Sequence, residues 1–380
     1  MKILFLDQSG KPGGAELCLL DIAQAYRDRC LVCLFSDGSF RTMLERAQMP
    51  VKVLASAIEV RKDSNVLQGL LSVGQLLRLA LEVSRLSRQY DAIYANTQKA
   101  LVVGALASIL SQRPLVFHLH DILSTEHFSR TNLRIAVTLV NRFAASVIAN
   151  SQASQSAFIA AGGQAKLTQV VYNGFNLDCY RDVKSHRLPL RQTLGFGERD
   201  FVVGHFSRLA PWKGQHLLIK ALTHCPASVS AILVGDALFG EEDYVTQLKQ
   251  QVKDLNLEYR VRFVGFRSDV GELMAACELV THTSTAPEPF GRVIVEAMLC
   301  GTPIVAAAAG GAMELVDHGV TGWLVTPNDP LQLAKIIQQC YERPDRFNKI
   351  AKQAQIVASQ RFDRDTISHQ IDQILQQAIG

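Results

Sequence analysis

Short runs of apolar and β-branched residues recur along the first part of the chain, separated by longer segments in which apolar residues fall three and four positions apart. The short runs predict buried strands, and the longer segments predict helices. Strands are expected at 3–6, 31–35, 51–54, 92–95, 115–119, 146–149 and 167–171, and helices at 15–27, 66–88, 99–112 and 131–144. Strands that alternate with helices of this length predict a parallel sheet covered on both faces.

The alternation stops at 178–199, a segment with many charges and no apolar periodicity, which we interpret as a linker. It resumes with strands expected at 201–206, 231–234, 261–264, 279–282, 304–306 and 323–325, and the region 345–380 predicts helix alone. A chain of 380 residues exceeds the ~250–300 residues that one hydrophobic core supports. We therefore expect an α/β protein of two Rossmann-like doubly wound domains, 1–177 and 178–360, that face each other across a cleft.

The composition argues against a disordered, secreted or membrane-spanning protein. Hydrophobic residues make up 48% of the chain and charged residues 19%, which is typical of a globular protein. No uncharged apolar run reaches the ~18–20 residues that span a bilayer, and no secretory signal opens the sequence. Eight cysteines lack a disulfide framework. Cys30 directly precedes the expected strand 31–35 and Cys33 lies in it, and positions three apart on a strand point to opposite faces, so packing explains them better than a metal site. These features predict a cytoplasmic protein.

Positive charge is concentrated in the first half. Residues 1–177 hold 18 Lys and Arg against 12 Asp and Glu, whereas residues 178–380 hold 21 against 23. This excess suits an anionic ligand or a membrane surface, although ordinary scatter explains it equally well. The apolar segment 66–88 carries Arg78, Arg85 and Arg88 in its trailing half. We interpret it as a core helix; the alternative is a helix that touches a membrane carrying a lipid-linked acceptor.

Two loops of the first domain follow predicted strands and carry candidate chemistry. Gly13 and Gly14 lie at the entrance to a helix, where free N–H groups favour an anion. The pattern is not GxGxxG, so phosphate contact and plain turn chemistry stay equally open. His120 and Asp121 lie where the strand 115–119 ends, which allows His120 to act as a donor or general base. A lone histidine is more often structural, but the run His118-Leu-His-Asp121 at the carboxyl end of a strand favours a functional role.

Two loops of the second domain carry charged residues. Arg208 and Lys213 flank a turn set by Pro211, and their charges suit a diphosphate; the alternative is two solvated surface cations. Glu288 lies in a loop stiffened by prolines, and Glu296 lies on the helix that Gly291 opens. Carboxylates accept hydrogen bonds from the paired hydroxyls of a sugar or a ribose, and the N–H groups near Gly291 can meet phosphate. The alternative gives Glu296 a salt bridge and leaves Glu288 as a solvated loop tip.

The run from Glu288 to Glu296, Glu-Pro-Phe-Gly-Arg-Val-Ile-Val-Glu, resembles the Glu-x7-Glu signature of the family-4 retaining glycosyltransferases. Other landmarks agree with this resemblance: Gly13-Gly14, Asn150-Ser151, Tyr172-Asn-Gly174, Arg208 with Lys213-Gly214, Gly301-Thr-Pro-Ile-Val305, Gly310-Gly311 and Gly319-Val-Thr-Gly-Trp-Leu-Val325. The resemblance covers nearly the whole chain and is strongest at 200–330. It implies the two-lobed GT-B fold, with the final helix 361–380 packed on the first domain.

The family pattern also implies roles for particular residues. Glu296 would hold the ribose hydroxyls and Glu288 the donor sugar, assisted by the backbone of Phe290 and Gly291. Arg208 and Lys213 would neutralise the diphosphate, and the loop with Phe266 and Arg267 would hold the base through its backbone. In the first domain, which would bind the acceptor, Gly14 would contact phosphate and His120 the donor sugar. Ser207 departs from the glycine that is common before the arginine.

The activity that this resemblance implies is hexosyl transfer with retention, from a nucleotide sugar to a saccharide, lipid-linked or small-molecule acceptor in polysaccharide or glycoconjugate biosynthesis. UDP is the first expectation for the donor and GDP the second. No metal and no cofactor are expected, and Asp363-Arg-Asp365 is interpreted as a helix N-terminus rather than a metal-binding DxD motif. Nucleic acid is not expected as a partner, peripheral contact with the inner face of a membrane stays open, and so does the oligomeric state. Two rivals are a nucleotide-sugar 2-epimerase and a sugar-nucleotide-binding protein without turnover.

Overall fold

A computed structural model shows two compact units, each described here by itself. The first comprises Met1–Phe175 together with Arg364–Gly380, and the second comprises Asn176–Asp363. The structure describes residues 1–54, 66–125, 128–197, 199–238 and 240–380, and the side chains of these residues except 66–73. The predicted boundaries, after residues 177 and 360, fall within three residues of those observed.

The first unit is built on a seven-stranded parallel sheet in the order β3-β2-β1-β4-β5-β6-β7. Its strands are β1 (Ile3–Asp7), β2 (Cys30–Leu34), β3 (Val51–Val53), β4 (Ala92–Ala95), β5 (Leu115–Leu119), β6 (Ala144–Ala149) and β7 (Thr168–Val170). The central strands are buried on both faces, which explains why they read as unbroken apolar runs. Cys30 and Cys33 pack on opposite faces of the sheet, as predicted.

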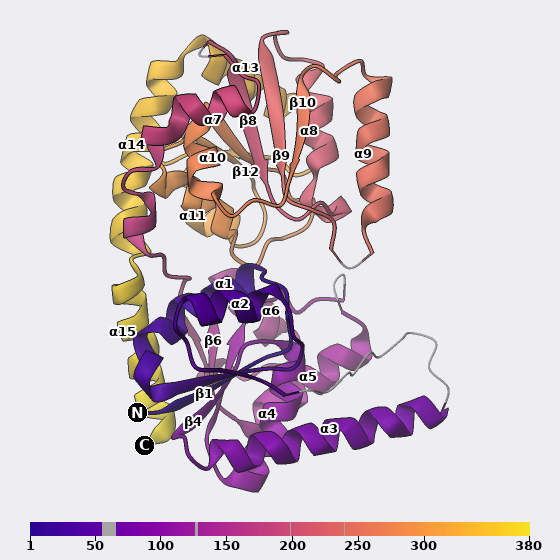
Figure 1. Cartoon of the computed structure of the whole chain (residues 1–380), viewed down its shortest axis with the longest axis vertical. Helices are drawn as coiled ribbons and strands as arrows, with labels where there is room; N and C mark the ends of the chain where they lie inside the picture. Colours follow the sequence, from indigo (N-terminus) through magenta and orange to yellow (C-terminus); the bar gives the residue numbers. More distant parts are fainter. Residues whose placement is uncertain (55–65, 126–127, 198, 239) are drawn as a thin grey trace. The chain divides into compact units, whose positions relative to one another are not determined.

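Helices cover both faces of this sheet (Figure 1). The helices are α1 (Gly14–Ala23), α2 (Ser39–Arg46), α3 (Val66–Ser87), α4 (Gln98–Ser111), α5 (Arg130–Phe143), α6 (Gln152–Ala160) and α15 (Arg364–Ile379), with 3-10 turns η1 (Gln24–Arg29) and η2 (Ala165–Leu167). Helices α1, α2 and α15 pack on one face, and α3, α4 and α5 on the other. This is the doubly wound arrangement that the alternation predicts.

The C-terminal helix α15 belongs to the first unit, although the whole second unit separates it from β7 along the chain. Ile367, Ile371 and Leu375 are buried among the apolar side chains of α1 and β1. The Tyr26 hydroxyl donates to Asp372 at 3.0 Å. In Figure 1 the two ends of the chain lie near each other in this unit.

Helix α3 contains most of the apolar segment 66–88, for which the sequence allows a place in the core or at a membrane. Leu79 and Val83 are buried, and the helix packs on α4. Leu77 and Leu81, in contrast, are 50% and 47% exposed, and Arg78 is exposed beside them. The described part of α3 therefore has a core face and an outer face that mixes leucine with arginine. Within the described ranges, no helix is long and apolar enough to cross a membrane.

The second unit contains a six-stranded parallel sheet in the order β10-β9-β8-β11-β12-β13. Its strands are β8 (Phe201–Phe206), β9 (Val229–Val234), β10 (Val261–Gly265), β11 (Leu279–His282), β12 (Ile304–Ala307) and β13 (Trp323–Val325). Its helices are α7 (Arg187–Thr193), α8 (Gln215–Leu222), α9 (Glu242–Asp254), α10 (Val270–Ala276), α11 (Arg292–Leu299), α12 (Ala312–Leu315), α13 (Pro330–Glu342) and α14 (Pro344–Arg361), with 3-10 turns η3 (Leu177–Tyr180), η4 (Val183–His186) and η5 (Pro211–Lys213). A second Rossmann-like unit is thus confirmed, and its parallel strands bring their following loops to one edge of the sheet.

The predicted linker at 178–199 is wrong. The segment folds into η3, η4 and α7 and packs on α10. Arg191 is only 1% exposed, and its Nη1 donates to both carboxylate oxygens of Glu278 at 3.0 Å; Arg187 pairs with the same carboxylate. The charges that resembled a solvated connection instead form a partly buried ion cluster around Arg191, which a pattern of apolar residues cannot reveal.

Candidate active site

Glu288 lies in the loop after β11, and its side chain is buried within the second unit, with 9% of the residue exposed. Lys213, at the end of η5, donates from Nζ to Oε1 and to Oε2 of Glu288, each at 2.8 Å. Ser284 Oγ donates to Oε2 at 2.9 Å, and His282 Nε2 lies 3.3 Å from the same oxygen. The alternative of a solvated loop tip is therefore wrong for Glu288.

This environment keeps Glu288 ionised. Burial by itself would raise the pKa of Glu288, but the charge of Lys213 and the hydrogen bonds from His282 and Lys213 lower it far below its ordinary value. A carboxylate that stays charged near neutral pH is a poor proton donor or acceptor. It is, however, a strong acceptor of hydrogen bonds from hydroxyl groups.

Lys213 is held in place from several sides. Its Nζ lies 4.0 Å from the centroid of the Trp212 ring, a cation–π contact. Its carbonyl oxygen accepts from Thr283 Oγ1 at 3.1 Å and faces His205 Nε2 at 3.2 Å. Burial and the neighbouring His282 lower the pKa of His205 to about 3, so His205 is neutral and adds no charge that would compete with Lys213.

The loop that carries Lys213 and the loop that leads to Glu288 are joined through their backbones. Thr285 N–H donates to the Trp212 carbonyl at 2.7 Å, and Thr283 Oγ1 donates to the Gly214 carbonyl at 2.9 Å. Gly214 has a φ of +74°, and a Cβ there would lie 2.0 Å from the Thr283 carbonyl oxygen. Only glycine permits both this conformation and this approach.

The glycine pair after β12 fixes the other side of the Glu288 loop. Gly311 N–H donates to the Glu288 carbonyl at 2.7 Å. A Cβ at Gly310 would lie 2.3 Å from that carbonyl oxygen, and one at Gly311 would lie 2.5 Å from the Pro289 carbonyl oxygen. Gly310 and Gly311 thus let the segment after β12 approach the backbone of the Glu288 loop. This close approach explains why two glycines stand at these positions.

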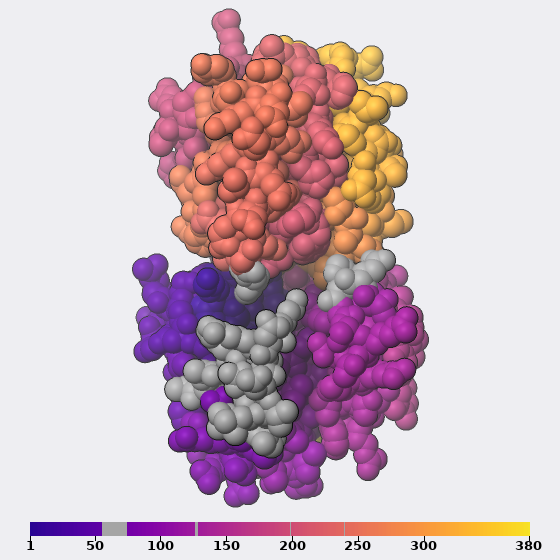
Figure 2. Space-filling view, turned by 90° about the vertical axis from the view of Figure 1, so that its right-hand side faces the viewer, coloured from indigo at the N-terminus to yellow at the C-terminus, as the bar shows by residue number. Residues whose placement is uncertain are grey.

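The other charged residues predicted for this site are paired. Glu296, on α11, has its Oε1 3.5 Å from Arg292 Nε. Arg208 Nε lies 3.2 Å from Glu241 Oε2, at the start of α9, and both side chains are largely buried at 26% and 20% exposure. Figure 2 shows α9, in orange, on the surface of the unit. Neither Arg208 nor Lys213 is therefore a solvated surface cation.

The remaining predicted residues of this unit lie in two loops. Phe290, 2% exposed, packs edge-on against Phe362, and Gly291, with a φ of +96°, begins α11. Phe266 is 64% exposed after β10, and its N–H donates to Asp236 Oδ2 at 3.1 Å. Arg267 forms an ion pair with Asp269. The backbone of the 265–267 loop is thus shaped by Asp236, a residue that the sequence pattern did not single out.

In the first unit, Gly13 is the N-terminal cap of α1, and Gly14 is its first residue. The Gly13 N–H donates to Glu16 Oε2 at 2.9 Å, so a carboxylate of the protein already meets this helix entrance. Burial, with the nearby charge of Asp7, raises the pKa of Glu16 to about 7. Burial also raises the pKa of Asp7 to about 6, against the hydrogen bonds from Ser9 and Asn96 that lower it.

His120 lies at the end of β5, as predicted, and is oriented by a chain of polar groups. Its Nε2 lies 2.9 Å from Asn96 Oδ1, and Asn96 Nδ2 donates to Asp7 Oδ2 at 2.7 Å. The rings of His118 and His120 lie with their centroids 3.9 Å apart and their planes tilted by 37°. Asp121 accepts from Gln98 Nε2 at 3.3 Å. Asp7, Asn96 and His120 thus meet at the carboxyl ends of β1, β4 and β5.

Sequence reasoning missed several of these residues: Asp7, Glu16 and Asn96 in the first unit, and Asp236, Glu241, His282 and Ser284 in the second. Some of them carried a signal in the sequence. Asp7 and Asn96 are polar residues at or directly after the ends of apolar strands, which is where Rossmann-like folds place their sites. His282 and Ser284 flank a strand end as well, but Glu241 has no comparable pattern.

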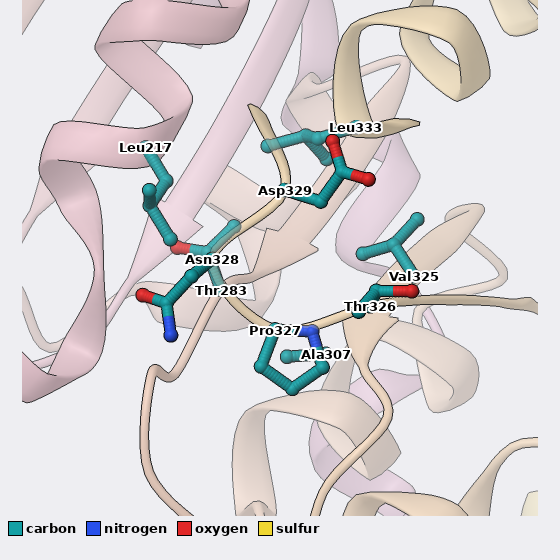
Figure 3. A pocket seen from close by; sticks show the side chains of 9 residues that line it. All are labelled: Leu217, Thr283, Ala307, Val325, Thr326, Pro327, Asn328, Asp329 and Leu333. Atoms are coloured by element: carbon teal, nitrogen blue, oxygen red, sulfur yellow. The ribbon is translucent and has the colours of Figure 1, made fainter. Parts of the chain in front are cut away.

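A small pocket of the second unit lies beyond the carboxyl ends of β12 and β13 (Figure 3). It is lined by Leu217, Thr283 and the loop Thr326–Asp329, among others, and has a volume of about 10 Å³. That is about the space one water molecule needs, so this cavity is too small for a nucleoside. Thr283 connects it to the Lys213 loop.

Comparisons with known proteins agree with this geometry. The family description "Glycosyl transferases group 1" matches residues 187–357, and "Glycosyltransferase Family 4" matches residues 12–179. The solved structure of Anabaena Alr3699/HepE in complex with UDP and glucose shares 62% identity, covers 99% of both chains and superposes with a TM-score of 0.93. Sucrose-phosphate synthase from Thermosynechococcus elongatus, at 20% identity over 99% of this chain and 98% of its own, shares the fold with a TM-score of 0.83.

Curated relatives are more distant. The N-acetyl-alpha-D-glucosaminyl L-malate synthase of Bacillus anthracis is 30% identical over 54% of this chain, which spans about half (52%) of the length of that relative. D-inositol 3-phosphate glycosyltransferase 1 of Catenulispora acidiphila is 30% identical over 69% of this chain and 66% of its own length.

Two doubly wound units, with Glu288 in the loop before helix α11 of the second and Glu296 within that helix, have the architecture of a glycosyltransferase of the GT-B class. Both family descriptions and the near-complete match to HepE lead to a narrower statement. The chain belongs to the family-4 glycosyltransferases.

The close approach at Gly214 predicts a large loss of stability in Gly214→Ala. The alanine would need both a left-handed conformation and displacement of the Thr283 carbonyl, so we expect a loss of more than about 3 kcal/mol. Gly319 is the matched control, because its φ is +77° and nothing lies within 4 Å of the position that a Cβ would take; Gly319→Ala should cost only about 1–2 kcal/mol. Urea unfolding followed by the fluorescence of Trp212 and Trp323 measures both, and equal losses would contradict the account.

Replacing Lys213 should destabilise the protein in a pH-dependent way. In the wild type the pKa of Glu288 is lowered, so the pair contributes stability above the ordinary carboxyl pKa, and this contribution is lost as the pH falls toward the lowered value. In Lys213→Met, burial without the cation raises the pKa of Glu288, so acidification favours the folded variant. We expect the deficit, about 3–5 kcal/mol at pH 8, to shrink toward pH 5.

Two controls distinguish the effect of breaking the Lys213–Glu288 ion pair from the effect of removing any lysine. Lys220→Met changes an exposed lysine on α8 and should leave the unfolding free energy nearly unchanged at both pH values. Adding Glu288→Gln to Lys213→Met should recover much of the loss at pH 8, because it removes the unpaired buried charge. A deficit that stays constant or grows on acidification would contradict the assignment.

Proposed function

We propose that this protein transfers a hexosyl group from a UDP-sugar to an acceptor, with retention of the anomeric configuration. The observation that carries the proposal is the buried, charged Glu288, which is held by Lys213 and lies eight residues before Glu296 in the loop that leads into α11. The structures of HepE with UDP, with UDP and glucose, and with UDP-glucose support UDP over GDP as the nucleotide of the donor. HepE is about 62% identical to this chain over 99% of its length.

Glu288 is assigned to the hydroxyls of the donor sugar. Its carboxylate has two oxygens with about four acceptor positions. Lys213, Ser284 and His282 all contact Oε2, whereas Oε1 accepts from Lys213, and the second acceptor position of Oε1 is assigned to the sugar. Glu296, on the helix that follows, is assigned to the ribose. The N–H groups at the start of α11 then face the diphosphate, with Phe290 and Gly291 contributing backbone contacts.

Lys213 and Arg208 are assigned to the leaving diphosphate. An ammonium group has three N–H donors, and two of them reach Glu288, so the third can bind a phosphate oxygen. Arg208, anchored through Nε to Glu241, adds a second positive charge. Together they supply the charge that a divalent metal supplies in other phosphoryl and glycosyl transfers.

Retention without a covalent intermediate fits the state of Glu288. A carboxylate bound tightly by a lysine is a weak nucleophile and a weak base, so it suits binding better than attack. The departing phosphate oxygen would then accept the proton of the acceptor hydroxyl on the face where the new bond forms. His120, held by Asn96, is assigned to the donor sugar near the reacting carbon.

The acceptor is proposed as a saccharide, lipid-linked or small-molecule hydroxyl compound in the cytoplasm, in polysaccharide or glycoconjugate biosynthesis. The outer face of α3 supports a lipid-linked acceptor at the inner face of a membrane. There, Leu77 and Leu81 are about half exposed, and Arg78 is exposed beside them. Apolar residues next to cations are the composition that binds an anionic membrane surface.

Two substitutions test how the roles of the carboxylates are divided. Glu288→Gln keeps the shape of the loop while removing the charge, and it should abolish donor hydrolysis yet bind UDP within about threefold of the wild type. Glu296→Gln should weaken UDP binding about tenfold or more, roughly 1.4 kcal/mol, because the ribose loses a charged acceptor. Calorimetry with UDP measures both affinities, and equal losses in the two variants would show that the division is wrong.

Removing divalent metal ions with a chelator tests which groups neutralise the charge of the diphosphate. We expect EDTA to leave the turnover of a UDP-sugar undiminished, because Lys213, Arg208 and the N-terminus of α11 neutralise the leaving group. Adding Mg²⁺ or Mn²⁺ should then give no gain. Activity that disappears with EDTA and returns with either ion would contradict this, and would direct attention to Asp363 and Asp365.

The membrane proposal predicts binding that salt reverses. The protein should sediment with anionic liposomes at low salt and be released as salt rises, since each near-surface cation contributes about 1 kcal/mol and is screened within about a Debye length. Reversing the charges of Arg78, Arg85 and Arg88 should abolish sedimentation and leave donor hydrolysis intact. A wild type that ignores these liposomes at low salt would leave a soluble acceptor as the proposal.

A further inference from the structure

Three side chains that commonly bind transition metals converge in the first unit. They are Cys18 on α1, His118 in β5 and His120 just after it, and their ligand atoms all lie within 4.8 Å of one another. Cys18 and His118 are each 1% exposed, whereas His120 is half-buried. Across the ranges that the structure describes, this is the one group of three or more such side chains close enough to share an ion.

His118 has a buried nitrogen with no hydrogen-bond partner. Its Nδ1 lies 2.6 Å from the Tyr94 hydroxyl, whereas its Nε2 is buried and unpartnered. A buried polar atom without a partner destabilises the folded protein, so its retention calls for an explanation. With the proton on Nδ1 and directed at Tyr94, the lone pair of Nε2 is available to a metal ion.

His120 is supported by the kind of contact that orients a metal ligand. Its Nε2 lies 2.9 Å from the Asn96 carbonyl oxygen, and Asn96 is itself fixed by Asp7. A metal-bound histidine usually donates its other N–H to such an oxygen. This arrangement gives Nδ1 of His120 the role of the ligand atom.

Cys18 supplies the soft ligand. Its Sγ lies 3.3 Å from Asn173 Oδ1, so an amide oxygen or a water molecule can complete the coordination. One thiolate and two imidazoles suit tetrahedral zinc, with bonds of about 2.0–2.3 Å. Ligand atoms in such a site are roughly 3.3–3.8 Å apart by that geometry. Since the ligand atoms here lie within 4.8 Å of one another, the cluster needs to close by at most about 1.5 Å to reach this geometry.

We propose that Cys18, His118 and His120 form a zinc-binding site, and that occupying it inhibits glycosyl transfer. On binding, the Cys18 thiol loses its proton to solvent and a zinc–sulfur bond forms. His120 becomes a metal ligand and turns away from the donor sugar. The inhibition rests on the role proposed for His120, whereas the metal site itself does not.

Metal binding is tested in a Cys179→Ser background, because Cys179 is the one exposed cysteine of the eight. Co²⁺ alone is the probe, since a thiolate bound to Co²⁺ gives a charge-transfer absorption band in the near ultraviolet. We expect one equivalent of Co²⁺ to produce this band and Zn²⁺ to displace it. Cys18→Ser should abolish the band and weaken Zn²⁺ binding at least tenfold, whereas Cys33→Ser, a buried cysteine outside the cluster, should change neither.

His118→Gln is the second variant, and circular dichroism with thermal unfolding checks that each variant is folded. A folded Cys18→Ser protein that binds Co²⁺ like its parent, or a parent without the band, overturns the site. Inhibition is then read from UDP-sugar turnover with and without Zn²⁺, which should inhibit the parent and spare Cys18→Ser. A parent that shows the band but keeps full turnover overturns the inhibitory role alone, and a parent without any turnover points to the proposed function instead.

Discussion

A carboxylate taken out of water stays ionised only if a cation and several hydrogen bonds replace the lost hydration, and Glu288 imposes this requirement on the second unit. Lys213 reaches both of its oxygens, and Lys213 is itself fixed by the loop that ends at Gly214. Because the two residues come from loops 75 positions apart, their backbones must run close together. The glycines at 214, 310 and 311 make that approach possible, since a side chain at any of them would collide with a carbonyl.

The first unit is organised by a different principle, the meeting of polar residues at the ends of neighbouring parallel strands. Asp7 ends β1, Asn96 follows β4 and His120 follows β5, and the amide of Asn96 links the other two. The orientation of His120 therefore depends on residues that are far away in sequence. Ligand atoms of Cys18 and His118 lie within 4.8 Å of one from the same histidine, so Asn96, which orients His120, would also orient a ligand of the proposed metal site.

Much of the fold could be predicted because parallel strands buried on both faces leave an unmistakable apolar pattern. The exception is the segment 178–199, where Arg187 and Arg191 are charged in sequence but paired with Glu278 in the structure. Charge pairing between distant positions has no signature in a single sequence. The same reason explains why Glu241, the partner of Arg208, was not predicted.

In the candidate site, too, local patterns could be predicted from the sequence and contacts between distant positions could not. Glu288 and Glu296 are recognisable because their spacing is local, within one loop and the helix that follows it. Lys213 was selected for a diphosphate, whereas its contact with Glu288 emerges only from the fold. Asp7 and Asn96 carried a usable signal as polar strand ends, but glycine and histidine patterns are more conspicuous in that unit.

The central claim is that the second unit binds the nucleotide of a UDP-sugar, and nucleotide-dependent stability tests it most directly. Unfolding of the wild type would be measured with UDP, GDP, ADP and dTDP at equal concentrations. We expect UDP to give the largest gain, about 2.7 kcal/mol at a hundred times its dissociation constant, and the other three to give far less. No gain with any of the four, or equal gains with all of them, would contradict the claim.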